Sequence, residues 1–452
     1  MQVSQAQGPS KSLVVGRLER LKKFMTKKQI RIDISALKVS RDFRLIFSAG
    51  VISNFGSMMT YVAMPFQIKE ITNSYLWVGA VGIVETIPLI VFGLYGGVLA
   101  DAFNRKKLIW ISEFAAMIVS ILLLFNVILG LNSPVLILVL AAIFAATDGI
   151  FRPAVDATTP QVVPYKNLAS AGALNSLRHQ SASIAGPMIG GVILAAGGIA
   201  LAYLIDVLTF VISLYLLIKI KNAFPSGGAE NPSLKRIKEG IKYALSRKDL
   251  LGTYLVDLSA MFFAFPYALF PFVADQLGGA WTLGFLYAAI PAGALIATLT
   301  SGWSNHVSRH GRIIALAACG WGLGIILFGL VHSFVFAIIG LMIAGFFDQI
   351  SAIFRGLIWN QSIPDHLRGR LASIEMLSYS VGPQLGQVRG AVFAKVGGLE
   401  FSLISGGILT IASSIIFSAM LKDFYKYDVN TNVFAKKLKE FREKSVISDP
   451  NM

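Results

Sequence analysis

The stretch GGVLADAFNRKKL, residues 96–108, brings a long and almost uncharged run to an end with one acid and three bases. A run of roughly 20 apolar residues can cross a bilayer as a helix. Lys and Arg directly after such a run are typical of the cytoplasmic end of a span. The stretch therefore predicts a transmembrane helix that leads into a short cytoplasmic loop.

The composition extends this prediction to the whole chain. Of its 452 residues, 55% are hydrophobic and 14% are charged, and the mean hydropathy is +0.67. Soluble domains carry about 25% charged residues. The apolar runs are continuous, whereas barrel strands alternate over about ten residues, so we predict an all-α membrane protein. Twelve spans are expected, at 43–70, 75–100, 107–130, 134–158, 168–197, 200–220, 250–274, 281–304, 312–332, 334–360, 370–397 and 399–421.

The bases indicate the orientation. If the N-terminus lies in the cytoplasm, the segments predicted to face inside hold 34 of the 40 Lys and Arg residues. This asymmetry predicts a multi-pass protein of the inner or plasma membrane with both termini cytoplasmic. The net charge of +16 is then a topology signal and an attraction to anionic lipid, and we expect no nucleic-acid partner. A single cysteine, Cys319, excludes a disulfide framework and a cysteine metal site, and we expect no cofactor or metal.

The chain repeats itself at an offset of about 200 residues. Asp148 recurs as Asp348, Pro164 as Pro364, and Gly186-Pro187 as Gly382-Pro383. Two six-helix bundles that face one another across a central cavity explain this repeat, as in rocking transporters. The predicted organisation is a basic, amphipathic tail (1–42), an N-terminal bundle (43–220), a cytoplasmic linker (221–249), a C-terminal bundle (250–421) and a cytoplasmic tail (422–452).

Two motifs resemble signatures of a known family. GGVLADAFNRKK resembles the signature between spans two and three of the major facilitator superfamily, although Ala102 replaces its usual base and the second copy has Asn305 in place of the acid. AGPMIGG (185–191) resembles a Gly-Pro-x-x-Gly-Gly signature of proton-driven exporters in that superfamily. The resemblance implies a role in the conformational change for Gly97, Asp101, Arg105, Lys106, Gly186, Pro187, Gly190 and Gly191.

Each motif also has a plainer interpretation. Asp101 and Arg105 are one helical turn apart and can pair as a latch that closes the cytoplasmic side. The bases alone would equally serve to keep the loop inside. Pro187 kinks its helix and the glycines beside it allow close packing, which an ordinary membrane helix also needs.

Four further stretches narrow the resemblance. VAMPFQIKEITNSYLWVG (62–79), DGIFRPAVDATTPQVVP (148–164), LIDVLTFVIS (204–213) and GFLYAAIPAGALIATLTSG (284–302) are similar to the exporter branch that contains the bacterial enterobactin exporter, with macrolide-efflux and multidrug pumps as relatives. The resemblance covers residues 36–423 and neither tail. It implies a major facilitator fold and transport out of the cell.

Charged residues inside the spans are the candidates for function, because a charge in the bilayer is costly. Asp148, Arg152 and Asp156 follow one another at intervals of four residues. We expect Arg152 and Asp156 to form a structural ion pair, and Asp148, which lies deeper, to bind substrate or a proton.

Two more acids are candidates for proton coupling. Glu85 and Asp257 lie near the middle of their spans, without a base within one helical turn. A carboxyl group removed from water without a cation binds a proton more readily. The alternative is a neutral acid that is hydrogen-bonded to a neighbouring helix.

Arg178 and His179 are candidates for substrate binding. They precede the Gly-Pro pair of span five, and the planar guanidinium group of Arg178 suits an anionic or catecholate substrate. The alternative is that Arg178 pairs with Asp148. In the N-terminal tail, Val14, Leu18, Leu21 and Met25 predict one apolar face of a helix that lies on the cytoplasmic leaflet.

The motifs of catalysis and of ATP use are missing from the sequence: there is no H-E-x-x-H, no G-x-S-x-G and no G-x-x-x-x-G-K-[ST]. We therefore predict a protein that is not an enzyme, and that exports a small amphiphilic molecule, a siderophore such as enterobactin or a drug, by proton antiport with alternating access. The alternatives are a multidrug or macrolide efflux pump, a proton-coupled importer and a membrane scaffold that does not transport. The expected partners are the substrate, protons and the lipid bilayer, and we expect a monomer.

Overall fold

The computed structural model describes residues 33–220, 242–330 and 332–448. Every long element in this part of the chain is a helix, which agrees with the need of a membrane-spanning chain to satisfy its backbone hydrogen bonds internally. The α-helices are α2 (Ser35–Val39), α3 (Arg41–Thr72), α4 (Tyr75–Ala102), α5 (Arg105–Ile128), α6 (Pro134–Val162), α7 (Leu168–Ile218), α9 (Lys248–Ala264), α10 (Phe270–Leu277), α11 (Ala280–Leu299), α12 (His310–Leu330), α13 (Phe334–Ser362), α14 (Asp365–Met420), α15 (Lys422–Tyr425) and α16 (Val433–Ser448). Short 3₁₀ turns lie at Tyr165–Asn167, Tyr267–Leu269 and Ser301–His306.

Ten helical segments of the described chain are long and apolar enough to cross a membrane. Two of them contain a break. Gly198 in α7 has φ 74° and Gly398 in α14 has φ 87°, values that favour glycine. Each break divides a long segment into two crossings, so the predicted all-α membrane fold of twelve spans is confirmed. The predicted loops at 198–199 and 398 are single glycines at which the chain reverses.

The helix ends follow from local sequence. Ser40, Asn104 and Ser133 precede α3, α5 and α6, and the side chain of each accepts a hydrogen bond from a backbone N–H of the first turn. Asn73 ends α3 in the left-handed conformation, with φ 44°. The span predicted at 250–274 consists of α9, a 3₁₀ turn and α10, and Pro266 directly precedes the 3₁₀ turn.

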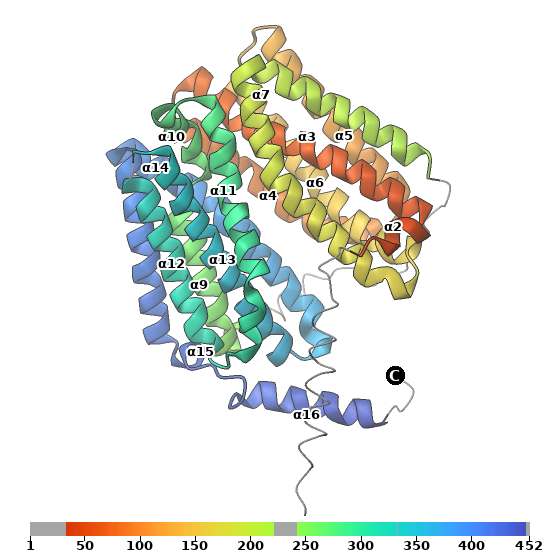
Figure 1. The fold of residues 1–452 in the computed structure, drawn as a ribbon, viewed down its shortest axis with the longest axis vertical. Helices are drawn as coiled ribbons and strands as arrows, with labels where there is room; N and C mark the ends of the chain where they lie inside the picture. Colours follow the sequence, from red (N-terminus) through yellow and green to blue (C-terminus); the bar gives the residue numbers. More distant parts are fainter. Residues whose placement is uncertain (1–32, 221–241, 331, 449–452) are drawn as a thin grey trace, which may run out of the picture.

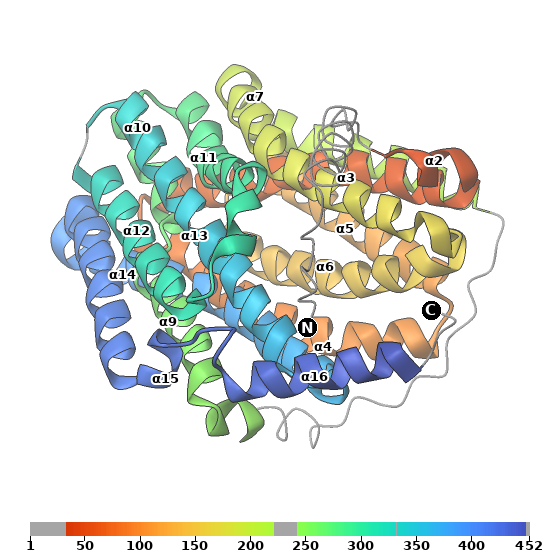
Figure 2. The same cartoon turned by 60° about the horizontal axis from the view of Figure 1, so that its bottom comes forward.

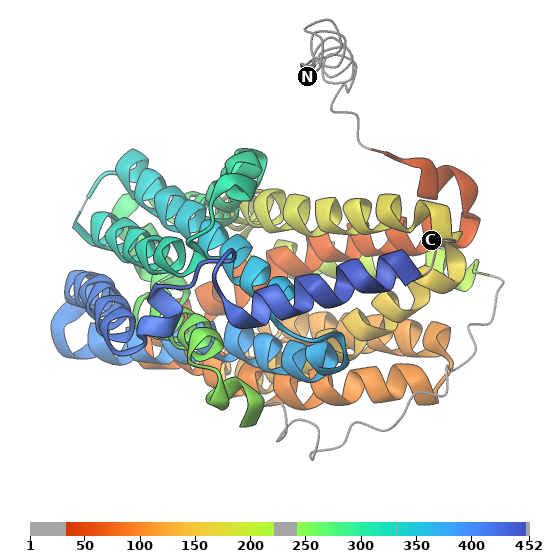
Figure 3. The ribbon, with the colours of Figure 1, turned by 90° about the horizontal axis from the view of Figure 1, so that it is seen from below.

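The helices form two groups. Figure 1 shows α3 to α7 on one side and α9 to α14 on the other, close together near α10 and the tip of α7 and diverging toward the end that carries α15 and α16. Between the groups, α4 packs on α14 and α7 packs on α11. Helix α16 runs across the end of the molecule (Figures 2 and 3) and packs against α13.

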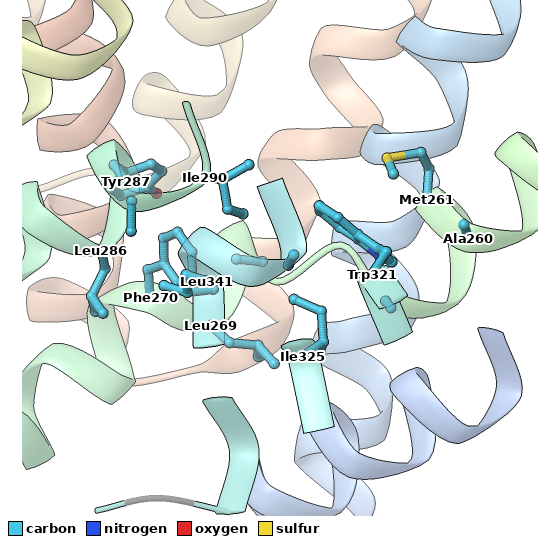
Figure 4. Close-up of a cluster of buried hydrophobic side chains, with 14 of the residues drawn as sticks. Ala260, Met261, Leu269, Phe270, Leu286, Tyr287, Ile290, Trp321, Ile325 and Leu341 are labelled. Carbon is cyan, nitrogen blue, oxygen red and sulfur yellow. The ribbon is translucent and has the colours of Figure 1, made fainter. Parts of the chain in front are cut away.

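The apolar core of the C-terminal group lies between α9, α10, α11, α12 and α13 (Figure 4). Trp321, Phe270 and Ile325 are almost completely buried there. Small residues allow the close approach of the helices around this core. A Cβ atom on Gly324 would lie 2.9 Å from the Cα atom of Ala344, so α12 and α13 can pack this closely only with glycine at that position.

The domain boundaries remain predictions. Most of the predicted linker, 221–241, lies outside the described residues, as does the predicted amphipathic helix of the N-terminal tail. Helix α3 begins at Arg41 and the break of α7 lies at Gly198, which agrees with the predicted spans within a few residues.

Candidate functional site

A cavity of about 470 Å³ lies mainly within the N-terminal group of helices. It is lined by residues of α3, α4, α5, α6 and α7, together with Ser380 and Gln384 of α14. This volume is in the range of small-molecule sites. The apolar part of the wall consists of Met58, Leu89, Ile90, Phe144, Phe151 and Phe210.

The charged part of the wall is acidic. Four carboxyl groups line the cavity, and the basic or titratable nitrogen groups on its wall are Arg152 and His179. The four acids are Glu85, Glu113, Asp148 and Asp156. The two proton candidates Glu85 and Asp148 thus share the cavity. The side chain of Gln384, on the opposite group of helices, donates a hydrogen bond to Glu85 Oε2 at 3.3 Å.

Arg152 pairs with Asp148. Its Nε atom lies 2.9 Å from Asp148 Oδ2, one helical turn away on α6. The expected ion pair of Arg152 with Asp156 is therefore not the one that forms, because the guanidinium group turns back toward the preceding turn. The positive charges that act on the Asp156 carboxyl group are that of Arg178 and, more weakly, that of Arg152.

Arg178 and His179 lie side by side, with Nη2 of Arg178 3.4 Å from Nε2 of His179. His179 lines the cavity. Arg178 is 5% exposed and packs on α3, where a Cβ atom on Gly50 would overlap its guanidinium group. Its Nε and Nη1 atoms lack a hydrogen-bond partner in the part of the chain that the structure describes. Arg178 therefore lies behind the wall, within the electrostatic reach of Asp156 and Glu113.

Asp257 belongs to a separate polar cluster. It forms a buried ion pair with Arg355 of α13, which also donates a hydrogen bond to Ser351 Oγ at 3.0 Å. A void of about 10 Å³ adjoins this cluster and is lined by Asp348 and Trp321 as well. The premise that Asp257 has no basic partner is thus wrong, because α13 supplies one that spacing along α9 could not reveal.

The glycines of the 185–191 motif lie at helix contacts. A Cβ atom on Gly186 would lie 2.6 Å from Met58 Cβ, and one on Gly190 would lie 3.2 Å from Met59 Cα, both on α3. Gly191 faces the other group of helices, where a Cβ atom would lie 2.8 Å from Gly284 Cα. Pro187 lies inside α7. The motif therefore lies where α7 is sandwiched between α3 and α11.

The motif at the end of α4 is described in part. Arg105 is buried and donates a hydrogen bond from Nη1 to the carbonyl oxygen of Ala157 at 2.7 Å, and Lys106 donates to the carbonyl oxygen of Ile220. Gly97 and Asp101 lie within α4, and the side chain of Asp101 is outside the described part. The pairing of Asp101 with Arg105 remains a prediction.

An aromatic cluster joins the two groups of helices beside the cavity. Tyr61, which lines the cavity from α3, contacts Tyr267 and Tyr287 with ring centroids 6.3 and 5.8 Å apart. Nearby, Lys69 at the end of α3 forms an ion pair with Asp275 of α10. Helix α10, which carries Asp275, lies at the end of the molecule where the two groups are close together (Figure 1).

The model of the transmembrane secretion effector family matches residues 35–444. The chain belongs to this family of the major facilitator superfamily. It is therefore a secondary transporter of small molecules in a membrane, and the prediction that it is not an enzyme is confirmed. The prediction of a major facilitator exporter branch from residues 96–107, 185–191 and 284–302 is likewise confirmed at the level of the family.

Curated relatives agree with this assignment. The chain is 31% identical over 405 residues to the enterobactin exporter EntS of Shigella boydii, which covers 86% of this chain and 95% of that protein. It is 33% identical over 401 residues to EntS of Shigella flexneri, with the same coverage. These matches make the bacterial inner membrane the expected location of the transporter.

Solved structures share the fold. The nucleoside transporter NupG covers 86% of this chain and 100% of its own, with a TM-score of 0.63 at 12% identity. A bacterial homologue of the iron transporter ferroportin covers 84% of this chain and 98% of its own, with a TM-score of 0.65 at 13% identity. At these identities, both similarities show the fold alone.

Sequence reasoning did not single out several residues of the cavity. Tyr61 and Gln384 are polar residues in otherwise apolar spans, and Gln384 directly follows the repeated Gly-Pro pair, which was the available signal. Glu113 can be recognised from the sequence as an acid inside the predicted span 107–130. Its contact with Ser53 could not be foreseen, because it depends on how α3 packs beside α5.

Proposed function

We propose that this transporter exports a small amphiphilic molecule in exchange for protons by alternating access. The observation that carries the proposal is the cavity itself, whose apolar wall holds four carboxyl groups, Glu85 and Asp148 among them. Carboxyl groups can bind a proton in one state of the transporter and release it in another. No nucleotide-binding motif occurs in the sequence, so an ion gradient is the available source of energy.

The proposed substrate is a siderophore of the catecholate class, such as enterobactin. Phenolic hydroxyl groups donate hydrogen bonds, and the carboxyl groups and Gln384 on the cavity wall can accept them. The relatives are enterobactin exporters, which supports the same class. His179 remains our candidate for substrate contact on the wall, and Arg178 is proposed to act from behind it through Asp156.

A multidrug or macrolide efflux pump is the second candidate. An acidic cavity with aromatic and aliphatic walls also suits a cationic amphiphile, because its charge would be paired while its apolar part is buried. A panel of substrates separates the two candidates.

We propose that both termini are cytoplasmic and that the protein works as a monomer with the five segments predicted from the sequence. In that orientation the Tyr61 cluster and the Lys69–Asp275 pair lie on the outer side, and the cavity is closed to the outside. Asp101 is proposed to latch the opposite, cytoplasmic side in the alternate state.

The test is transport in proteoliposomes with an imposed pH gradient and a panel of siderophores and cationic drugs. We expect the wild type to concentrate a catecholate substrate. The amide variants Glu85→Gln, Asp148→Asn and Asp257→Asn are compared singly, and Asp148→Asn is expected to abolish concentration by the pH gradient while downhill equilibration continues. Accumulation that needs substrate on the outer side would establish import instead, and no transport of any compound by the inserted protein would favour a scaffold.

A further inference from the structure

Three neighbouring helices of the N-terminal group carry a repeated pattern of buried polar residues. Helices α3 and α5 both pack against α7. Each has two such residues seven positions apart, which is close to two helical turns and places both on one face. They are Ser53 and Thr60 on α3, Glu113 and Ser120 on α5, and Asp206 and Ser213 on α7.

These residues fall into two layers. In the first, Ser53 Oγ donates a hydrogen bond to Glu113 Oε1 at 2.9 Å. In the second, Thr60 Oγ1 and Ser120 Oγ donate to Asp206 Oδ2 at 2.5 and 2.7 Å. Seven helical residues separate the layers by about 10 Å. Gly56 lies between the two layers. A Cβ atom on Gly56 would lie 2.5 Å from Oδ1 of Asp206, so the lack of a side chain at Gly56 leaves room for the Asp206 carboxyl group.

The pattern continues by one more interval along α3. Gln67 follows Thr60 by seven residues, and the hydroxyl group of Tyr203 donates to its Oε1 at 2.8 Å. Both side chains are buried, at 1% and 0% exposed. We call the set from Ser53 to Gln67 on α3, with its partners on α5 and α7, the polar column. It extends from the cavity toward the end of the molecule where the helix groups meet.

The column begins at the cavity. Ser53 and Glu113 line the cavity, whereas Asp206 is completely buried away from it. Glu113 Oε2 is buried and has no hydrogen-bond partner among the described residues, so this oxygen of a cavity-lining residue can carry a proton. A proton that arrives through the cavity can bind to this oxygen.

The charges around the column are few. Within the described chain, neither Glu113 nor Asp206 forms an ion pair. The charged or titratable groups that face Glu113 are Asp206 and Arg178, and Arg178 in turn faces Asp156. The titratable group beside Asp206 on its own helix is Tyr203. Two buried carboxylates without a paired cation are costly in the membrane interior, so a proton on one of them is stabilising.

We propose that the polar column is a proton site of this transporter, which begins at Glu113 on the cavity wall and continues behind the wall to Asp206. The proton binds Glu113 Oε2 from the cavity, and Asp206, about 10 Å further along the column, is a second buried carboxyl group that can hold it. When Glu113 is protonated, Asp156 is the acid that still acts on Arg178, and the charge on the cavity wall has changed by one. This inference rests on the proposed proton antiport and names where its proton is held.

The test compares Asp206→Asn and Glu113→Gln with Glu70→Gln, an exposed acid on the same α3 helix as Ser53. Infrared difference spectra of the purified protein in lipid are recorded across a pH titration, because a protonated carboxyl group has its own C=O stretching band. We expect each column variant to lose one titrating band that Glu70→Gln keeps. In proteoliposomes, the column variants should lose concentration of substrate by a pH gradient but retain downhill equilibration.

A second pair of variants keeps the test independent of folding. Thr60→Ser retains the hydroxyl group that donates to Asp206, and Thr60→Val removes it with little change of shape. We expect wild-type coupling in Thr60→Ser and a loss of about tenfold in Thr60→Val, the effect of one hydrogen bond to a charged group. Wild-type bands and wild-type concentration in Asp206→Asn and Glu113→Gln would overturn the proposal.

Failure of the proposed antiport gives a different result. If the wild type does not concentrate substrate on any pH gradient, but its Asp206 and Glu113 bands still titrate, proton binding by the column stands and proton antiport is wrong. If the wild type is driven by the pH gradient and no titrating band is lost in either column variant, antiport stands and the column is not its proton site.

Discussion

The acids inside the spans form ion pairs both within one helix and between helices, as Asp148 with Arg152 and Asp257 with Arg355 show. Glu85, Asp148 and Asp257 were all found as charges within apolar spans, and the structure places the first two on one cavity. Arg152 was expected to bind Asp156 and binds Asp148, while Asp257 binds Arg355 on another helix. Spacing along one helix determines which residues share a face of that helix. A contact between two helices also depends on how the helices are rotated and packed, and the local sequence of one helix does not reveal this.

The Asp257–Arg355 pair leads to a prediction about stability. Both side chains are buried, at 4% and 7% exposed. Arg355→Gln should lower the free energy of unfolding by about 3 kcal/mol, because it leaves the Asp257 carboxylate buried without a cation. Asp257→Asn/Arg355→Gln should recover most of the loss. Thermal unfolding in detergent measures both, and equal melting temperatures for wild type and Arg355→Gln would show that the pair contributes nothing.

Asp428 gives a prediction about pH outside the membrane. It accepts hydrogen bonds from the backbone N–H of Asn430 at 2.9 Å and from Ser308 Oγ at 3.0 Å, and the backbone hydrogen bond is the largest cause that lowers the pKa of this carboxyl group below 3.8. A lowered pKa means that the stabilisation is complete above 3.8 and is lost as the pH falls through the lowered value. The protection of the α16 amides against hydrogen exchange, relative to their intrinsic exchange rate at each pH, should therefore decrease below about pH 4. Asp428→Asn should show the same reduced protection at every pH, and a variant whose protection still falls below about pH 4 would contradict the assignment.

At the scale of the element, the spans were predictable because hydrophobicity and length decide them. The twelve predicted spans match the helices, although the seventh consists of two helices joined by a 3₁₀ turn. The transverse helix α16 was not expected as a helix. Its apolar residues are few and its bases many, so hydrophobic periodicity gave a weak signal there, and its contact with α13 exists only in the folded protein.

The contact of α7 with α11 yields a prediction about conformation. A Cβ atom on Gly284 would lie 3.0 Å from Met188 Cα, which is closer than side chains pack against a backbone. Gly284→Ala should push the two helices apart and favour the state in which this end is open. Distances between spin labels at the ends of α7 and α11, measured in a Cys319→Ser background, should lengthen. Gly172→Ala, where a Cβ atom meets nothing within 4 Å, is the matched control, and identical distances in both variants would refute the argument.

At the scale of the whole molecule, the repeat and the base distribution predicted the architecture, and the fold bears out the two groups of six spans. The position of the cavity was not predicted. We expected it between the two bundles, yet it is lined mostly by the N-terminal group and by two residues of α14. The repeat in the sequence indicates two similar halves, but it carries no information on how far one half is rotated against the other.

The orientation of the molecule is a prediction that reporters can test. A reporter fused after residue 228 should read cytoplasmic, and one inserted near residue 131 should read external, because 34 of the 40 bases lie in the segments predicted to face inside. The reverse pair of readings would overturn the orientation, and with it the assignment of the Tyr61 cluster to the outer side.

The single-glycine reversals at Gly198 and Gly398 have a consequence for biosynthesis. Each joins two spans without a polar loop, so neither span of the pair can settle across the bilayer while its neighbour is still outside the lipid. We therefore expect spans five and six, and likewise eleven and twelve, to enter the membrane together as helical hairpins. On this expectation the chain inserts in ten steps rather than twelve.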